Sequence, residues 1–269
     1  MSAFGVLARE AVVDAARRRI VAAVVVVSLL SLLMVESCTQ CSTAQVLVEG
    51  EVRDLVNVAG FTGSATFLVL ALWCVVLAGV LASDHLVETL EDGSAALCLA
   101  RPVGRGSFAA ARLTGALGVA WITAAVLLGA TAFLLRARGQ LPLAPAALAG
   151  LATAAGTLVV GALAMTTSLF LPRLAVVLLV FVSVAGVALA NATGMVRAVA
   201  SPDADLGLLG LVDRFGPPLA TSLALALAPW LPNVSVPGDP VAVAVRLAGW
   251  ALVSLALLVF AFRRIELGR

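Results

Sequence analysis

Six long apolar stretches run through this sequence, and none of them contains Asp, Glu or Lys. They cover residues 20–35, 61–82, 113–135, 141–171, 174–190 and 241–262. A helix needs ~20 apolar residues to cross a bilayer, because each residue adds ~1.5 Å toward a ~30 Å hydrocarbon core. Charged residues make up only 12% of the chain, about half of the ~25% typical of soluble domains. The sequence therefore predicts an all-α polytopic membrane protein, with six transmembrane helices in a single domain over residues 1–269.

Prolines mark two breaks in this pattern. Pro172 and Arg173 divide an otherwise very long apolar run, which predicts a tight hairpin between the fourth and fifth spans. The apolar segment 219–231 is ~20 Å long as a helix, too short to cross alone. It lies within residues 202–240, which hold seven of the eleven prolines. We expect a re-entrant or interfacial helix pair in an outer loop over 191–240; the alternative is a seventh span.

The arginines set the expected orientation, because all 17 basic residues are Arg and none is Lys. With six spans and an internal N-terminus, the cytoplasmic segments hold Arg9, Arg17, Arg18, Arg19, Arg101, Arg105, Arg112, Arg173, Arg263, Arg264 and Arg269. The outer segments hold Arg53, Arg136, Arg138, Arg197, Arg214 and Arg246. Cytoplasmic loops are enriched in basic residues, so this excess predicts that both termini are cytoplasmic. The arginine bias is typical of a GC-rich bacterial genome, and we expect the bacterial inner membrane.

Several function classes are poorly supported by these residues. Ion-coupled carriers and charged channel filters use ionisable groups inside the membrane, and the six runs contain no Asp, Glu or Lys. A phosphate-binding P-loop needs a Lys, so we expect no nucleotide site in this chain. The arginines are scattered, which argues against a nucleic-acid partner. The small residues of the spans, such as Gly156 and Gly161, suit close helix packing, or alternatively a polar lining for a substrate path.

Residues 1–19 predict a short helix ahead of the first span. Apolar residues share one side of it: Phe4, Leu7, Ala8, Ala11, Val12 and Ala15. Charged residues share the other: Arg9, Glu10, Asp14 and Arg17. Such a helix lies in the headgroup plane of a membrane, and the alternative is a plain extension of the first span. A cleaved signal peptide is a further alternative for the first run, but no A-x-A pattern follows it.

The expected cytoplasmic loop over residues 83–112 contains a distinctive order of residues. Its first part is acidic, with Asp84, Glu88, Glu91 and Asp92. Gly93 then breaks the pattern, and Ser94 is placed to cap a short helix over 95–100 that exposes Leu97 and Leu99. Arg101-Pro102 ends that helix. A short helix with an apolar face outside the membrane is expected to dock onto another protein.

The order of residues in this loop resembles the loop after the second helix of ABC-2 type transporter permeases. The family pattern is approximately E-x-x-x-G-T-x-x-x-L-L-x-x-P-[VI]-x-R followed by a Lys. The matching residues here are Glu88, Gly93, Leu97, Leu99, Pro102, Val103 and Arg105. Ser94 stands for the Thr, Arg112 stands for the Lys, and the Leu spacing differs slightly. The chain layout, with an interfacial helix, six spans and re-entrant helices before the last span, also resembles the family.

The resemblance implies one subunit of an ATP-driven transporter, with no enzymatic activity of its own. Two such permease subunits, identical or paralogous, pair in the bilayer, and two separate ATPase subunits bind ATP and Mg below them. The loop is then the coupling element that contacts the ATPase, through Glu88, Glu91, Gly93, Ser94, Leu97, Leu99, Arg101, Pro102 and Arg105. The rival interpretation is a membrane scaffold or assembly factor that recruits a different cytoplasmic partner through the same loop.

Two cysteines, Cys38 and Cys41, follow the first predicted span on the expected outer side. A C-x-x-C pair in an oxidising compartment suits a short-loop disulfide. Free thiols and a soft-metal site remain alternatives, although two thiols without a nearby His fall short of a closed metal site. Cys74 and Cys98 are expected to act as small apolar residues.

Overall fold

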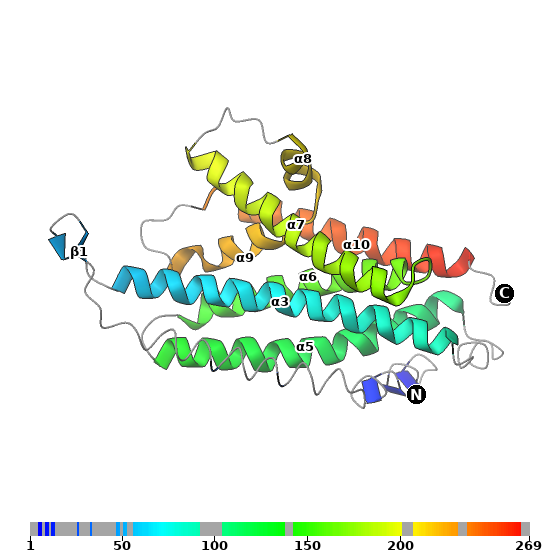
Figure 1. Ribbon diagram of the computed structural model, residues 1–269. Helices are drawn as coiled ribbons and strands as arrows, with labels where there is room; N and C mark the ends of the chain where they lie inside the picture. The colour runs from blue at the N-terminus through cyan, green and yellow to red at the C-terminus, as the bar shows by residue number, and fades with distance from the viewer. Residues whose placement is uncertain are drawn as a thin grey trace.

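The computed structural model describes residues 5–6, 9–10, 12–13, 26, 33, 47–48, 51–52, 56–91, 104–137, 142–200, 207–230 and 236–264. In chain order the elements are β1 (Leu47–Val48), β2 (Glu51–Val52), α3 (Val56–Glu91), α5 (Arg105–Ala137), α6 (Leu143–Thr167), α7 (Arg173–Ala200), α8 (Gly207–Phe215), α9 (Leu219–Leu227), η1 (Ala228–Trp230) and α10 (Pro240–Arg264). The long helices form one elongated bundle (Figure 1). The prediction of a mainly helical protein is confirmed for the described residues. The predicted number of six spans stays a prediction.

Within the part of the chain that the structure describes, five helices are long and apolar enough to cross a membrane: α3, α5, α6, α7 and α10. They correspond to the second to sixth of the predicted spans and give the chain a membrane-embedded character. Helix α6 is shorter than the predicted span 141–171, because the chain turns after Thr167. The first predicted span, residues 20–35, lies outside the described residues except for Val26 and Leu33, which are helical. The described residues of the 1–19 segment are also helical, and the Val12 side chain lies against α5 close to Gly118.

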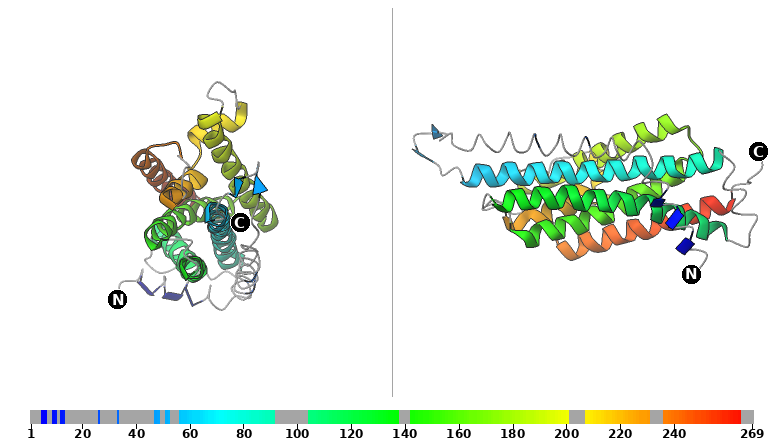
Figure 2. Two further views of the ribbon diagram at one scale, coloured as in Figure 1. Left: turned by 90° about the vertical axis from the view of Figure 1, so that its left-hand side faces the viewer. Right: turned by 90° about the horizontal axis from the view of Figure 1, so that it is seen from below.

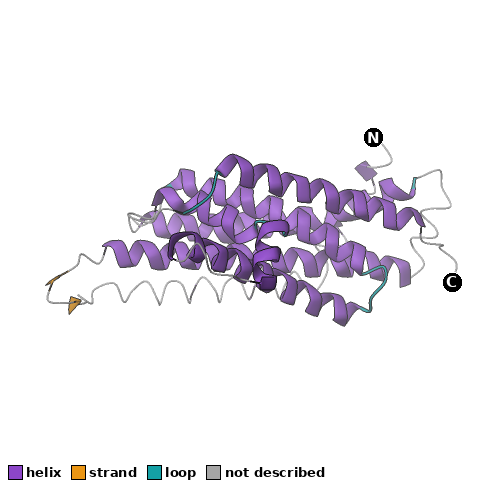
Figure 3. Ribbon diagram, turned by 90° about the horizontal axis from the view of Figure 1, so that it is seen from above, coloured by secondary structure: helices purple, strands orange, loops and turns teal. Residues whose placement is uncertain are grey.

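Both chain termini lie at one end of the bundle, which we call the termini end (Figures 1 and 2). Helix α3 finishes at this end and α5 begins there, and the turn from α6 to α7 lies there as well. The other end of the bundle carries the β1–β2 pair, in which Leu47 pairs with Val52 and Val48 with Glu51. Figure 3 shows these strands beyond the start of α3. This pair differs from the all-helical fold that the sequence predicts.

Helices α3 and α6 form the centre of the bundle. Helix α3 packs against α5, α6, α7 and α9, and α6 also packs against α5 and α10. The view along the bundle places α3 between the α5–α6 side and α7 (Figure 2, left). Close approach of these helices depends on glycine, because a Cβ on Gly79 of α3 would stand 2.8 Å from Val180 of α7 and 3.0 Å from Val160 of α6. Small residues permit such backbone proximity where no hydrophobic effect drives helices together.

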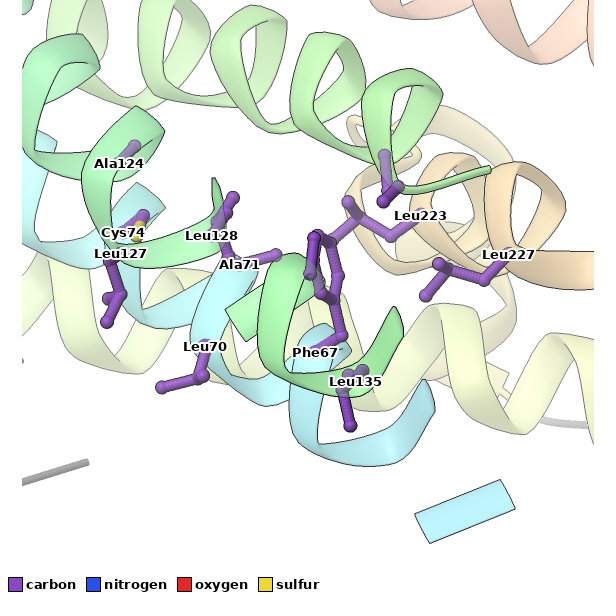
Figure 4. Packing of buried hydrophobic residues seen from close by; sticks show 13 residues of the cluster. Phe67, Leu70, Ala71, Cys74, Ala124, Leu127, Leu128, Leu135, Leu223 and Leu227 are labelled. Carbon is purple, nitrogen blue, oxygen red and sulfur yellow. The ribbon is translucent and has the colours of Figure 1, made fainter. Parts of the chain in front are cut away.

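The side chains between these helices form continuous apolar clusters. Figure 4 shows one in which Phe67 and Cys74 of α3 meet Leu127 of α5 and Leu223 of α9. Phe67 is fully buried, and Cys74 is a buried free thiol, in keeping with its predicted role as a small apolar residue. Helix α9 thus belongs to the bundle core and is not a surface appendage.

The chain between α7 and α10 begins and ends in the half of the bundle away from the termini end (Figure 1). It contains α8 and α9, each nine residues or ~14 Å long, well short of a bilayer. Pro217 and Pro218 separate the two helices, as the sequence predicts. Gly207 starts α8 with φ of 51°, a backbone conformation that glycine adopts without steric cost.

Candidate functional site at the termini end

The structure divides the predicted coupling residues into two groups. Glu88 and Glu91 lie in the last turns of α3, and Arg105 is the first residue of α5. The others lie outside the described residues: Gly93, Ser94, Leu97, Leu99, Arg101 and Pro102. The predicted short helix with exposed leucines therefore stays a prediction, and the described site is the pair of helix ends that hold this loop.

The described acidic residues of the 83–112 segment, Asp84, Glu88 and Glu91, are helical and not in a loop, which differs from the boundaries expected from the sequence. Helix α3 continues past Ala82 to Glu91, and α5 begins at Arg105. The physical reason is that the first polar residues after the apolar run find partners inside the bundle. Only residues 92–104 connect the two helices.

Asp84 is the central residue at the end of α3. Its side chain is only 3% exposed and forms an ion pair with Arg173, the first residue of α7. The guanidinium approaches through both Nε and Nη2, one toward each carboxylate oxygen, and Nη2 donates a hydrogen bond to Oδ2. Forked contacts of this kind are the strongest that Arg makes with a carboxylate. This pair joins the base of α3 directly to the turn between α6 and α7.

Two further polar residues flank Asp84 in the sequence and are also buried. The Ser83 hydroxyl donates to the Val80 carbonyl at 2.8 Å, so it is satisfied within its own helix. His85, the single histidine of the chain, is 1% exposed. Buried polar groups are costly unless they are paired, and of these residues Asp84 has a partner on another helix, so its ion pair fixes the position of the helix end.

Aromatic packing fixes the start of α5 in a different way. Phe108 is fully buried and stacks on Phe262 of α10, with ring centroids 5.9 Å apart and planes inclined by 26°. The guanidinium of Arg112 lies 5.3 Å from the Phe108 ring centroid, a cation–π distance. Gly106 allows the two helices to approach closely, since a Cβ there would stand 3.1 Å from Val259. The start of α5 is therefore held against the end of α10.

The 92–104 connection thus leaves from two anchored helix ends. One is joined to α7 by the Asp84–Arg173 pair, and the other to α10 by the Phe108–Phe262 stack. A force applied to this connection would act on four of the five long helices. The two contacts, an ion pair and a ring stack, hold the described helix ends in place.

A second polar cluster lies in the other half of the bundle. Asn191 of α7 is fully buried, and its amide donates to the Asp213 carboxylate of α8 at 2.9 Å and accepts from the Ala220 N–H of α9 at 3.1 Å. Arg246 of α10 donates through Nε to the Gly216 carbonyl at 3.0 Å, and through Nη2 to the Asp213 carbonyl. These bonds tie the α8–α9 segment to both α7 and α10.

Two contacts complete this second cluster. Trp250 of α10 donates its indole N–H to the Phe215 carbonyl at 3.0 Å. Gly194 of α7 lies so close to α8 that a Cβ there would clash with the Asp213 carboxylate. Sequence reasoning missed this cluster, because Asp213 and Asn191 lie in the segment treated as an outer loop. The one available signal was Arg246, a charge within an apolar run.

The predicted disulfide residues, Cys38 and Cys41, lie outside the described residues, so their state stays a prediction. Among the residues that the structure does describe, no group of three or more His, Cys, Asp or Glu side chains could hold a metal ion. No protein-family model matches the chain, and no curated protein matches it.

Proposed function

We propose that this chain is the transmembrane subunit of an ATP-driven ABC transporter of the ABC-2 permease type. It moves a substrate across the membrane, and a separate ATPase subunit hydrolyses the ATP. In this proposal residues 20–35 add a first span to the five long helices, and residues 1–19 form an interfacial helix. Both termini are cytoplasmic, so the termini end faces the ATPase.

The observation that carries the proposal is the anchoring of both ends of the 92–104 connection. An ATPase that binds this connection has to pass its movement to the membrane helices through rigid elements. Packed helices with fixed contacts transmit displacement, because cores and interfaces switch between discrete arrangements and do not deform continuously. Asp84–Arg173 passes movement of α3 to α7, and Phe108–Phe262 passes movement of α5 to α10.

The charge distribution supports the proposed orientation. Arginines lie near the helix ends that meet at the termini end: Arg105 and Arg112 at the start of α5, Arg173 at the start of α7, and Arg263 and Arg264 at the end of α10. The opposite helix ends carry Arg136 of α5, Arg197 of α7 and Arg246 of α10, and Arg214 lies in α8. In this orientation the short helices α8 and α9 do not cross the bilayer; they enter it from the outer side and return, with α9 covered by α3, α6 and α7. Protein cover of this kind is what non-spanning backbone at membrane depth requires.

An apolar stripe on α7 suits pairing with a second permease subunit. Leu174, Leu178 and Val182 are 76%, 57% and 71% exposed and recur every four residues, so they share one face of the helix. Leu189 and Val196 extend the stripe at spacings of seven. A second copy or a paralogue would cover this face, while the remaining outer surface contacts lipid. Because α7 is also joined to Asp84, the pairing surface is connected to the coupling end.

Co-purification tests the proposal directly. Leu97→Asp places a charge in the expected ATPase contact, and an unpaired charge in a desolvated interface costs several kcal/mol. Even ~3 kcal/mol weakens binding by about a hundredfold. The variant should insert normally and lose a P-loop ATPase that co-purifies with the wild-type protein from native membranes.

Leu208→Asp is a matched control, because Leu208 of α8 is 77% exposed and lies away from the termini end. This variant should retain the ATPase. Equal ATPase recovery with Leu97→Asp and wild type would contradict the coupling role of the loop. Recovery of a partner without a P-loop would favour the scaffold interpretation instead.

A further inference from the structure

An apolar groove of about 760 Å³ runs along the outer surface between α5 and α6. Its floor is built from small residues, Ala124, Gly129 and Ala132 of α5 and Ala146, Gly150 and Ala154 of α6. Phe133 and Leu151, each 69% exposed, form its walls. Because α5 and α6 are both long enough to span a membrane, this groove opens toward the bilayer.

Trp121 is the lining residue of α5 that lies nearest the termini end. Its indole N–H donates to the Thr157 hydroxyl at 2.8 Å, so its polar atom is satisfied and the ring presents carbon to the groove. Twelve residues separate Trp121 from Phe133, which corresponds to ~18 Å of helix. That length is close to half of the ~30 Å hydrocarbon core, the depth of one leaflet. The groove therefore has the dimensions of a site for one acyl chain.

The outer end of the groove carries a positive charge. Arg136 lies three and four residues after Phe133 and Ala132, so it lies on the same face of α5 as the groove. It is exposed and comes at the end of the apolar run, where a lipid phosphate lies. An arginine is well suited to bind that phosphate.

A neighbouring groove provides an internal comparison. It has a volume of about 380 Å³, lies between α6, α9 and α10, and includes Pro240 and Ala248 in its lining. The residue next to Pro240 is the exposed Asp239, whose carboxylate accepts the Val241 N–H at 3.0 Å. A carboxylate at this end repels a lipid phosphate. The two grooves are thus alike in apolar lining and opposite in terminal charge.

We propose that the α5–α6 groove binds an anionic phospholipid from the leaflet farther from the termini, with one acyl chain between Trp121 and Phe133 and the phosphate at Arg136. Two features distinguish this site from general lipid contact. The acyl chain lies below the surface of the helices, and Arg136 selects the headgroup. The proposal is independent of any ATPase partner.

Quenching of Trp121 fluorescence tests the site, because bromine on an acyl chain quenches a tryptophan only at close range. The protein carries Trp73→Phe, Trp230→Phe and Trp250→Phe, so that Trp121 is the only tryptophan that contributes to the measured fluorescence. It is reconstituted with phosphatidylglycerol or phosphatidylcholine bearing brominated chains. We expect half-maximal quenching at about fivefold less phosphatidylglycerol than phosphatidylcholine, which corresponds to the ~1 kcal/mol that one arginine contributes near an anionic surface.

Three variants separate the parts of the proposal. Arg136→Gln should abolish the preference for phosphatidylglycerol, and Gly150→Leu should reduce quenching by both lipids, because a Cβ at Gly150 meets no atom within 4 Å and the longer side chain enters the groove. Ala248→Leu fills the second groove and should change nothing. The thermal stability of each variant shows whether it has misfolded. Native mass spectrometry measures how much phosphatidylglycerol is retained by the protein with all four tryptophans, without the three Trp→Phe changes.

Equal quenching by the two lipids in the parent protein would overturn the headgroup assignment. Unchanged quenching in Gly150→Leu would overturn the acyl-chain site. A Trp121 that neither lipid quenches would mean that protein covers the groove, which also contradicts the proposal.

Discussion

The two polar clusters hold the bundle together by different chemistry. At the termini end, the side chains of Asp84 and Arg173 pair with each other and join two long helices. In the other half, Arg246 bonds to backbone carbonyls, and the Asn191 amide accepts a backbone N–H as well as donating to Asp213. The first arrangement fixes long rigid elements against each other. The second holds a short segment in place, largely by its backbone.

This difference predicts different consequences of damage. Removing one partner of a buried ion pair leaves a charge in a poorly hydrated place, so the whole helix end is destabilised. Removing a bond to the α8–α9 segment leaves the long helices intact and releases the segment. The termini end is therefore suited to passing movement between helices, and the α8–α9 segment to moving on its own.

The largest effect is expected from Arg173→Ala, which leaves the buried Asp84 carboxylate without its charged partner. We expect a loss of ~2 kcal/mol in stability. This is less than the ~3–5 kcal/mol of a fully buried pair, because Arg173 is 61% exposed and water can enter where it was. Thermal aggregation of the detergent-solubilised protein measures the loss.

The double variant Asp84→Asn/Arg173→Gln is the control for this change, because it removes both charges together. It should recover most of the lost stability. If it is as unstable as Arg173→Ala, the effect comes from lost packing at the turn, and the ion pair is not the link between α3 and α7.

A smaller effect is expected from Asn191→Ala, which removes two hydrogen bonds and leaves the buried Ala220 N–H without an acceptor. A buried N–H without an acceptor lowers stability by ~1–2 kcal/mol. The release should be local, so hydrogen exchange should increase in α8 and α9 while α3 and α5 stay protected. Thr193→Ala is the matched control, since the Thr193 hydroxyl bonds only within its own helix, to the Ala190 carbonyl at 2.9 Å. Uniform loss of protection across the bundle would contradict the local role.

The smallest effect is expected from Gly194→Ala, whose added Cβ meets the Asp213 carboxylate. The carboxylate has to move away, at a cost of ~1 kcal/mol for a small overpacking change. Gly186→Ala on the same helix is the control, because its Cβ meets no atom within 4 Å. Hydrogen exchange of α8 should rise in the first variant and stay unchanged in the second. Equal behaviour of the two would show that α8 does not depend on this close approach.

The sequence predicted the positions of five long helices, because each contains an apolar run long enough to cross a membrane. It did not predict their full lengths, since α3 with 36 residues and α5 with 33 residues extend beyond their apolar runs. In the apolar segment 219–231, the structure has the nine-residue helix α9 directly after Pro218, and the turn η1 contains Pro229. These features are local in the chain, so composition and helix geometry suffice to find them.

The polar clusters could not be predicted, because their partners are far apart in sequence. Asp84 follows an apolar run, so the sequence predicts that it lies at the start of a loop. Its partner Arg173 lies 89 residues later in the chain. Asn191, Asp213 and Arg246 come from three elements whose packing no local pattern reveals. The coupling leucines present the reverse case: Leu97 and Leu99 stand out in the sequence but lie outside the described residues.

Site-specific photo-crosslinking compares the two ends of the molecule in a single experiment. A photoreactive residue replaces Leu97 in one variant and the exposed Asp239, near the start of α10, in another. The account predicts that irradiation of native membranes joins position 97, and not position 239, to a protein with a P-loop ATPase sequence. A crosslink to that ATPase from position 239, or none from position 97 in membranes that contain it, would contradict the proposed coupling at the termini end.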